Sequence, residues 1–248
     1  MSQQLSLNLR LKDGSSFSNF LAGTNREALD RLRAAVVAAA TGDKSSAQMI
    51  FLWGADGSGK SHLLQAACRL AQELGIAPVY VPFADVAALS PSLLESAEIA
   101  PLVCLDDVER IAGLPEWEMA LFTLTERLRS AGGTQINAAS TPPARLGLKL
   151  PDLTSRLAWG TVYALEPLAD EGKLEAIRLR ARNRGFDMPE EVVQYILGRY
   201  PRDMHSLFDL LDRIDRASLA QQRRVTIPFL RRLEEEGKDD AGVGIPAS

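Results

Sequence analysis

The residues from 54 to 61 constrain the fold of this chain more than any other segment. They are Gly-Ala-Asp-Gly-Ser-Gly-Lys-Ser and match the pattern G-x-x-x-x-G-K-S/T in full. An apolar stretch predicted as a strand, residues 49–53, precedes them, and a stretch predicted as a helix, residues 62–74, follows. A strand, a glycine-rich loop and a helix in this order form a phosphate-binding loop. The sequence therefore predicts an open α/β fold with a nucleotide site.

Each residue type in this loop suits phosphate binding. Glycines let backbone N–H groups turn toward phosphate oxygens, and the start of the following helix adds its positive dipole end. Lys60 is expected to reach the β- and γ-phosphates, and the Ser61 hydroxyl is expected to ligate Mg²⁺. An ordinary glycine-rich turn before a helix is the alternative. The residues predicted to hold the nucleotide are Gly54, Ala55, Asp56, Gly57, Ser58, Gly59, Lys60, Ser61 and His62.

Two adjacent carboxylates end another predicted strand. Residues 102–105 are Leu-Val-Cys-Leu, and Asp106 and Asp107 follow them. Because open α/β sheets bind ligands in the crevice at the carboxyl ends of their strands, we expect both carboxylates there. Asp106 is predicted as the second Mg²⁺ ligand beside Ser61, and Asp107 as the group that polarises an attacking water. Alternatively, Asp107 caps the next helix, where aspartate is common.

Short apolar segments alternate with longer amphipathic ones over the first two thirds of the chain. This pattern is typical of a mostly parallel sheet whose strands are buried on both faces by helices. Thr24 and Glu27 form a Thr-x-x-Glu capping box, which predicts a helix from there to about residue 40. The predicted strands are residues 49–53, 79–83, 102–106, 135–139 and 162–165.

The character of the sequence changes after residue 166. We predict an α/β nucleotide-binding domain over residues 13–166 with a small helical domain after it over residues 167–236. A flexible segment over residues 1–12 and a disordered tail over residues 237–248 are expected to flank them. The predicted helices of the second domain are residues 170–183, 189–199, 203–220 and 226–236.

Composition narrows the class of protein. The chain has 46% hydrophobic and 24% charged residues, a balance typical of soluble globular proteins. Its formal net charge of −4 provides no overall positive field to attract DNA or an anionic membrane. Cys68 and Cys104 lack CxxC spacing, and no charged region followed by an apolar run opens the chain. We therefore expect a cytoplasmic protein without a zinc site. The large aromatic residues Trp53, Trp117 and Trp159 are expected to pack between the helices and the sheet.

The spacing of these motifs resembles that of the AAA+ ATPases of the DnaA family. Residues 17–25, Phe-Ser-Asn-Phe-Leu-Ala-Gly-Thr-Asn, are similar to the N-terminal signature that lies beside the nucleotide in that family. Residues 150–160, Leu-Pro-Asp-Leu-Thr-Ser-Arg-Leu-Ala-Trp-Gly, resemble the Hda branch of the family, the regulatory inactivators of DnaA. Trp-Glu-Met-Ala-Leu-Phe at 117–122 and Thr-Ile-Pro-Phe at 226–229 share this resemblance, which covers nearly the whole chain.

The resemblance implies roles for single residues. Arg156 matches the family's arginine finger, which acts on the γ-phosphate of a neighbouring subunit; a surface ion pair with Asp152 is the alternative. Arg202, which is predicted to open a helix of the second domain, matches the sensor-2 arginine that reports the nucleotide to the lid. Asn137 and Ser140 are both candidates for the sensor-1 residue, because the family's usual pattern is not preserved there.

The N-terminal residues carry a separate motif. Gln4-Leu5-Ser6-Leu7-Asn8-Leu9 resembles the Q-L-x-L-x-L motif by which Hda binds the sliding clamp of DNA polymerase III. A mobile extended segment can offer alternating leucines to an apolar groove while the glutamine amide forms hydrogen bonds. An edge strand is the alternative, since it shows the same alternation. The predicted clamp-binding residues are Gln4, Leu5, Leu7 and Leu9.

Together the resemblances imply a nucleotide-bound regulator of replication initiation. It would bind ADP or ATP with Mg²⁺, bind the DNA-loaded clamp, and stimulate hydrolysis of ATP held by DnaA through Arg156. It would contact DNA only through the clamp, since no basic helix-turn-helix domain is expected, and it could form a homodimer. Two alternatives stay open: an autonomous ATPase similar to a helicase loader, and a nucleotide-stabilised clamp adaptor in which Arg156 has no catalytic part.

Overall fold

The computed structural model describes residues 15–42, 48–221 and 225–240 of the chain. The predicted clamp-binding residues Gln4, Leu5, Leu7 and Leu9 lie outside this part. The chain divides into two compact units, Met1–Pro167 and Leu168–Ser248. Each unit has its own buried hydrophobic side chains.

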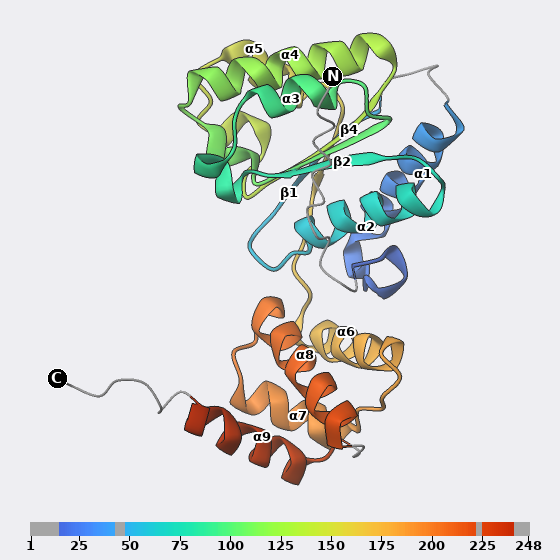
Figure 1. Ribbon diagram of the computed structural model, residues 1–248, viewed down its shortest axis with the longest axis vertical. Coiled ribbons are helices and arrows are strands. Elements are labelled where there is room, and N and C mark those ends of the chain that lie inside the picture. The colour runs from blue at the N-terminus through green and yellow to red at the C-terminus, as the bar shows by residue number, and fades with distance from the viewer. Residues whose placement is uncertain (1–14, 43–47, 222–224, 241–248) are drawn as a thin grey trace, which may run out of the picture. The chain divides into compact units, whose positions relative to one another are not determined.

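The first unit is built on a five-stranded sheet in the order β2-β3-β4-β1-β5, and every neighbouring pair of strands is parallel (Figure 1). The predicted α/β fold class and parallel sheet are confirmed, and no strand boundary differs from its predicted position by more than a single residue. The strands are β1 (Gln48–Trp53), β2 (Pro78–Pro82), β3 (Leu102–Asp106), β4 (Thr134–Ala139) and β5 (Thr161–Ala164).

Helices cover both faces of this sheet (Figure 1). The helices α1 (Arg26–Thr41) and α2 (Lys60–Glu73) pack on one face. The helices α3 (Ser92–Ala97), α4 (Pro115–Ala131) and α5 (Pro151–Leu157) pack on the other. The inner strands β1 and β3 are buried on both faces, which is why they are apolar almost without interruption.

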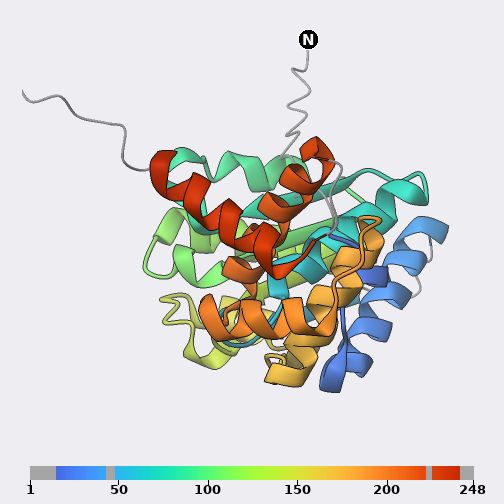
Figure 2. The same ribbon diagram turned by 90° about the horizontal axis from the view of Figure 1, so that it is seen from below.

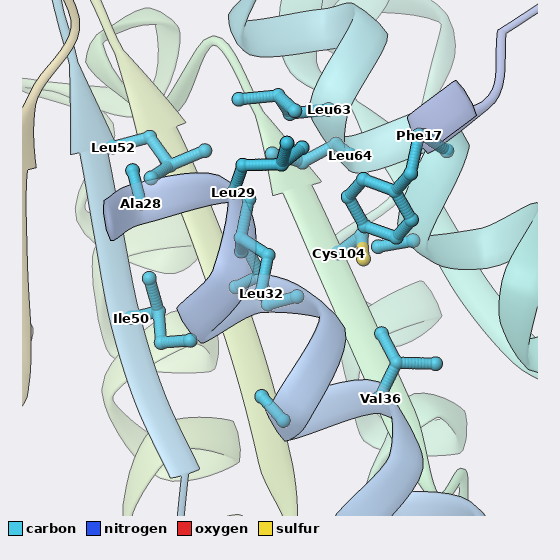
Figure 3. Close-up of a cluster of buried hydrophobic side chains, with 14 of the residues drawn as sticks. Phe17, Ala28, Leu29, Leu32, Val36, Ile50, Leu52, Leu63, Leu64 and Cys104 are labelled. Atoms are coloured by element: carbon cyan, nitrogen blue, oxygen red, sulfur yellow. The ribbon is translucent and has the colours of Figure 1, made fainter. Parts of the chain in front are cut away.

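Alternate residues of the inner strands supply the two cores. Ile50 and Leu52 of β1 belong to the core under α1 and α2, whereas Met49 and Phe51 belong to the opposite core. Figure 3 shows the first core, in which side chains of α1 point toward β1 and toward Cys104 of β3. The period of two along the strand therefore divides the sheet residues between the helical layers. Short 3₁₀ helices occupy several connections: η1 (Phe17–Asn19), η2 (Gly23–Asn25), η3 (Phe83–Ala88), η4 (Val108–Ile111) and η5 (Pro143–Arg145).

The start of α1 differs from the prediction. The helix begins at Arg26 with Asn25 as its N-cap, and no side chain caps it, so the predicted capping box of Thr24 and Glu27 is wrong. Thr24 Oγ1 donates to Glu166 Oε2 (3.0 Å). The Asn25 amide donates to Glu166 O and accepts from Glu166 N, both at 2.9 Å. Tertiary bonds to Glu166, which follows β5, have thus taken the polar groups that a local cap would use.

The second unit is helical in the part that the structure describes, and Figure 2 shows it in yellow-orange to red. The helix α9 runs past Glu236 to Asp240, so part of the predicted disordered tail is helical. A single glycine costs a helix only about 1 kcal/mol, which lets a formed helix continue over Gly237. No helix within the described ranges is long and apolar enough to cross a membrane. The helices are α6 (Asp170–Asn183), α7 (Glu190–Arg199), α8 (Met204–Gln221) and α9 (Ile227–Asp240).

Candidate functional site

The phosphate-binding loop joins the end of β1 to the start of α2. The Gly54 N–H donates to Ala139 O of β4 (3.3 Å), and the Leu63 N–H donates to Gly59 O (3.0 Å). Gly59 has a φ of +95°, and a Cβ at this position would lie 2.6 Å from Phe20 Cε2. The left-handed backbone and the contact with Phe20 both require glycine, so the sequence pattern reflects a real steric limit.

Lys60 and Ser58 place polar groups within this loop. Lys60 is 7% exposed, and its Nζ donates to Gly54 O (2.7 Å) and Ala55 O (3.1 Å). The buried Ser58 hydroxyl has no hydrogen-bond partner in the described part of the chain. A buried ammonium and an unpartnered hydroxyl beside a helix N-terminus fit an anionic ligand with several acceptor oxygens. The exposed predicted residues of the loop and helix start are Ala55, Asp56, Gly57 and Ser61.

Residues 17–25, the segment similar to the N-terminal signature of the DnaA family, lie against this loop. The ring of Phe20 lies 5.5 Å from the ring of His62, and His62 Nε2 lies 3.0 Å from Ser16 O. The segment reaches the loop through Phe20 and the end of β5 through Asn25. It therefore joins two neighbouring parts of the sheet edge at which the phosphate-binding loop begins.

Asp106 ends β3 with both carboxylate oxygens hydrogen-bonded. Its side chain is buried, Oδ2 accepts from Tyr80 Oη (2.8 Å), and Oδ1 accepts from the Asp107 N–H (3.1 Å). Burial, followed by the charge of Asp106, raises the pKa of Tyr80 well above its ordinary value. The phenol consequently remains protonated and acts as the donor to this carboxylate.

Asp107 adopts the left-handed backbone conformation, with φ +56° and ψ +47°. It occupies the N-cap position of η4, but its side chain makes no capping hydrogen bond, which disfavours the helix-cap alternative. Burial raises the pKa of Asp107, the carboxylates of Asp106 and Glu109 raise it further, and Lys60 and Arg110 oppose the rise. Asp107 thus experiences the charges of both the acidic strand end and the phosphate-loop lysine.

The two sensor-1 candidates occupy different environments. Asn137 is buried within β4, where it accepts from Gln135 Nε2 (2.8 Å) and its amide lies 3.5 Å from Ile50 O. Ser140 follows the end of β4, and its backbone N–H donates to Glu109 Oε1 (2.9 Å). Of the two, only Ser140 lies at the carboxyl edge of the sheet, beside the residues that follow β3.

Arg156 lies on α5 and pairs with α4. Its Nε lies 2.7 Å from Glu126 Oε1, an ion pair without hydrogen-bond alignment, and its side chain is 37% exposed. Glu126 also pairs with Arg129 at 3.0 Å. The ion-pair partner of Arg156 is therefore Glu126 and not Asp152, which was the alternative. The exposure leaves the guanidinium accessible on this surface while one carboxylate holds it.

Trp159 is an exception to the expectation that the tryptophans are packed between helices and sheet. Trp117 is 6% exposed and meets Phe83 edge-on, with ring centroids 5.5 Å apart. Trp159 is 54% exposed, and the Arg129 guanidinium lies 5.5 Å from its ring centroid. A large aromatic ring that faces solvent three residues from Arg156 is typical of a partner-binding surface.

Glu118 anchors the loop that leads into α5. This carboxylate, on α4, is 1% exposed. It accepts from the backbone N–H groups of Gly113 (2.7 Å), Lys149 (2.8 Å) and Leu150 (2.7 Å). Because Leu150 is the N-cap of α5, Glu118 fixes where the helix that carries Arg156 begins.

Arg202 lies in the second unit and precedes α8 instead of opening it. Its Nη1 donates to Asp170 Oδ2 (2.7 Å) at the start of α6, and its Nε donates to Leu197 O (3.1 Å). The side chain is 57% exposed. The helix starts later than predicted because Asp203 accepts from the Ser206 N–H (2.8 Å), as a helix N-cap does.

Sequence reasoning missed several residues of the site. Tyr80, Glu109, Glu118 and Glu126 each make at least one contact with a residue far away in the sequence. A weak signal existed for Glu118, an acidic residue next to Trp117 at the start of an amphipathic helix, and for Glu109, a third carboxylate close after Asp106 and Asp107. Nothing local distinguished the other two from ordinary strand and surface residues.

Comparisons with known proteins agree with this architecture. Residues 170–233 match the family model of the Hda lid domain. The structure is similar to AMPPCP-bound DnaA from Aquifex aeolicus, with a TM-score of 0.69 and 24% identity over 93% of this chain and 71% of that one. It is also similar to domain III of the replication initiation protein DnaA from Thermotoga maritima, with a TM-score of 0.68 and 20% identity over 90% of this chain and 96% of that one.

The sheet order, the phosphate-binding loop and the helical unit that follows give the chain the AAA+ fold that DnaA also has. At these identities the solved structures show the fold alone. The match of residues 170–233 to the Hda lid domain confirms, for this part of the chain, the resemblance to Hda that the sequence predicts.

Proposed function

We propose that this chain is an Hda-type regulator of replication initiation that supplies Arg156 to ATP held by DnaA. One observation carries the proposal: a chain whose second unit matches the Hda lid domain presents Arg156, 37% exposed, on an anchored helix pair beside an exposed tryptophan. A planar guanidinium that approaches a γ-phosphate stabilises the charge of the transition state. Arg156 would therefore act in trans, on nucleotide that a neighbouring molecule of DnaA holds.

The chain's own nucleotide site would stabilise the form that docks. The backbone N–H groups of residues 54–59 and the Lys60 ammonium would bind the phosphates of ADP or ATP, and Ser61 and Asp106 would hold Mg²⁺. The metal ion would neutralise part of the negative charge of the phosphates. The AMPPCP bound by the similar DnaA structure supports a nucleotide ligand. The buried, unpartnered Ser58 hydroxyl supports it independently.

The remaining assignments in the site are part of this proposal. Asp107 would orient a water molecule at the γ-phosphate, and its raised pKa makes it a better proton acceptor than an ordinary aspartate once ionised. Ser140 is favoured over Asn137 as the sensor-1 residue, because Asn137 already bonds to Gln135 within the sheet. Arg202 would contact nucleotide from the lid after exchanging its bond to Asp170.

Binding of the sliding clamp through Gln4, Leu5, Leu7 and Leu9 is proposed from the sequence motif. The clamp would bring the chain to the DNA on which the clamp is loaded, so that stimulation of DnaA depends on it. The effective concentration of a tethered partner reaches the millimolar range for short flexible linkers, which is enough to support a weak contact with DnaA.

Hydrolysis of DnaA-bound ATP tests this proposal, measured with and without DNA-loaded clamp. We expect this chain to stimulate hydrolysis only when clamp is present. Gln4→Ala should lose that stimulation, whereas Ser2→Ala, a change beside the motif, should keep it. An equal effect with and without clamp would reject the tether. Turnover of ATP by this chain alone, indifferent to DnaA, would instead identify an autonomous ATPase.

A further inference from the structure

Tyr80 contacts the carboxylate that is assigned to Mg²⁺, although it lies on a different strand. In the pairing of β2 with β3, Tyr80 is opposite Cys104 and Pro82 is opposite Asp106. The phenol therefore points along the sheet toward its carboxyl edge and donates from Oη to Asp106 Oδ2 at 2.8 Å. A bond of this length to a buried carboxylate is a strong, charge-assisted hydrogen bond.

The bond leaves Asp106 with a single orientation. Its other oxygen, Oδ1, accepts from the Asp107 N–H at 3.1 Å. A carboxylate has about four lone-pair sites, so these two bonds leave about two free to accept from a metal ion or from water bound to one. If the phenol were absent, only the backbone bond would resist rotation of the Asp106 side chain.

The helix that begins with the phosphate-binding residues also contacts the phenol. Gln65 of α2 lies with Nε2 3.5 Å from Tyr80 Oη, and its Oε1 accepts from Ser15 Oγ at 3.1 Å. Gln65 and Ser15 are both buried. A row of polar side chains thus runs from Ser15 through α2 to Asp106, inside a core that is otherwise apolar. Such buried networks hold their members in one arrangement when each is satisfied.

We propose that Tyr80 is a positioning residue for the Mg²⁺ that Ser61 and Asp106 hold with the nucleotide. Its hydroxyl holds the Asp106 carboxylate in one orientation, with about two lone-pair sites left to accept from the metal ion. Residues that hydrogen-bond to metal ligands commonly change metal affinity by about 10–100-fold when they are removed. This inference rests on the proposed binding of nucleotide and Mg²⁺, and it assigns to one phenol the orientation of the metal ligand.

The purely structural explanation is that Tyr80 satisfies a buried carboxylate and has no influence on a metal. The two explanations differ in what they predict for nucleotide affinity. A structural role would affect nucleotide binding equally with and without Mg²⁺, or not at all. A positioning role would affect only the part of the affinity that Mg²⁺ contributes.

The test uses the full chain, its Tyr80→Phe variant and a fluorescent ADP analogue. The Kd of the analogue is measured in EDTA and across a titration of Mg²⁺. We expect the Mg²⁺ concentration at half effect to rise by about 10–100-fold in Tyr80→Phe. The Kd in EDTA should stay within about twofold of the unsubstituted chain, since no phosphate contact changes. Tyr163→Phe is the matched control, because it removes a phenol that donates to Glu27 (3.3 Å) away from this site.

Two results would overturn the proposal. One is an unchanged Mg²⁺ midpoint in Tyr80→Phe, and the other is a loss of affinity that is the same in EDTA and in Mg²⁺. Gln65→Ala provides a second variant, which keeps the phenol. We expect a smaller rise of the Mg²⁺ midpoint in this variant than in Tyr80→Phe. An unchanged midpoint in Gln65→Ala would show that the row of polar side chains has no part in positioning Asp106. If the unsubstituted chain binds no analogue under any condition, the proposed nucleotide site itself fails, which is a separate result from a normal midpoint in the variant.

Discussion

Replacement of Arg156 by alanine is expected to abolish the stimulated hydrolysis of ATP held by DnaA, a loss of about 10³–10⁵-fold where such fingers act in other NTPases. The expectation follows from the position of the guanidinium, which is half-exposed and held at Nε by Glu126 on the neighbouring helix. Arg156→Lys should recover little, because an ammonium lacks the planar fork that bonds two phosphate oxygens at once. Clamp binding should be unaffected in both variants.

The measurement is the rate of ADP formation on DnaA under single-turnover conditions, with clamp present throughout. Arg145→Ala is the matched control, since it removes an exposed arginine from η5 of the same unit. The control should stimulate as the unsubstituted chain does. Full stimulation by Arg156→Ala would contradict the finger and leave the clamp-adaptor explanation in its place.

Replacement of Glu118 by alanine is expected to lower the free energy of unfolding of the first unit by about 3 kcal/mol or more. The buried carboxylate accepts from the N–H groups of Gly113, Lys149 and Leu150. Its removal leaves three backbone donors without their partner, at about 1–3 kcal/mol for each that stays buried. Against a total stability of about 5–15 kcal/mol for a typical domain, this is a large loss.

Urea denaturation followed by tryptophan fluorescence measures this effect in the right unit, because Trp53, Trp117 and Trp159 all precede residue 168. Glu116→Ala is the control: Glu116 also lies in the first turn of α4, but it is exposed. The control should change the stability by less than about 0.5 kcal/mol. Equal, small effects of the two substitutions would show that Glu118 does not hold the start of α5.

The strands β1 and β3 could be predicted because they are buried on both faces. Each has a run of apolar residues that is followed by a glycine-rich loop or by paired carboxylates. This local pattern is enough to indicate the position and the direction of the strand. The positions of Lys60, Ser61 and Asp106 followed from the same local patterns. The helices of the second unit were likewise evident from apolar periodicity and from Gly and Pro between them.

The features that could not be predicted from the sequence are contacts between side chains that are far apart in the sequence and meet only in the folded chain. The local sequence predicts Thr24 as a helix cap, but its hydroxyl donates a hydrogen bond to Glu166. Tyr80 reads as a strand residue, but it bonds to Asp106. Trp159 was expected in the core, and only the packed structure of α4 and α5 reveals that its ring faces solvent beside Arg129. In each case a tertiary partner outweighed the local preference that the prediction used.

The central claim is that the ATP cleaved is the one held by DnaA, and the most direct measurement labels that nucleotide alone. DnaA is loaded with radiolabelled ATP, this chain with unlabelled ADP, and both are mixed with DNA-loaded clamp. The account predicts that labelled ADP forms on DnaA at a rate that falls to the unstimulated level with Arg156→Ala. Labelled ATP that persists unchanged on DnaA at every concentration of this chain would contradict the account.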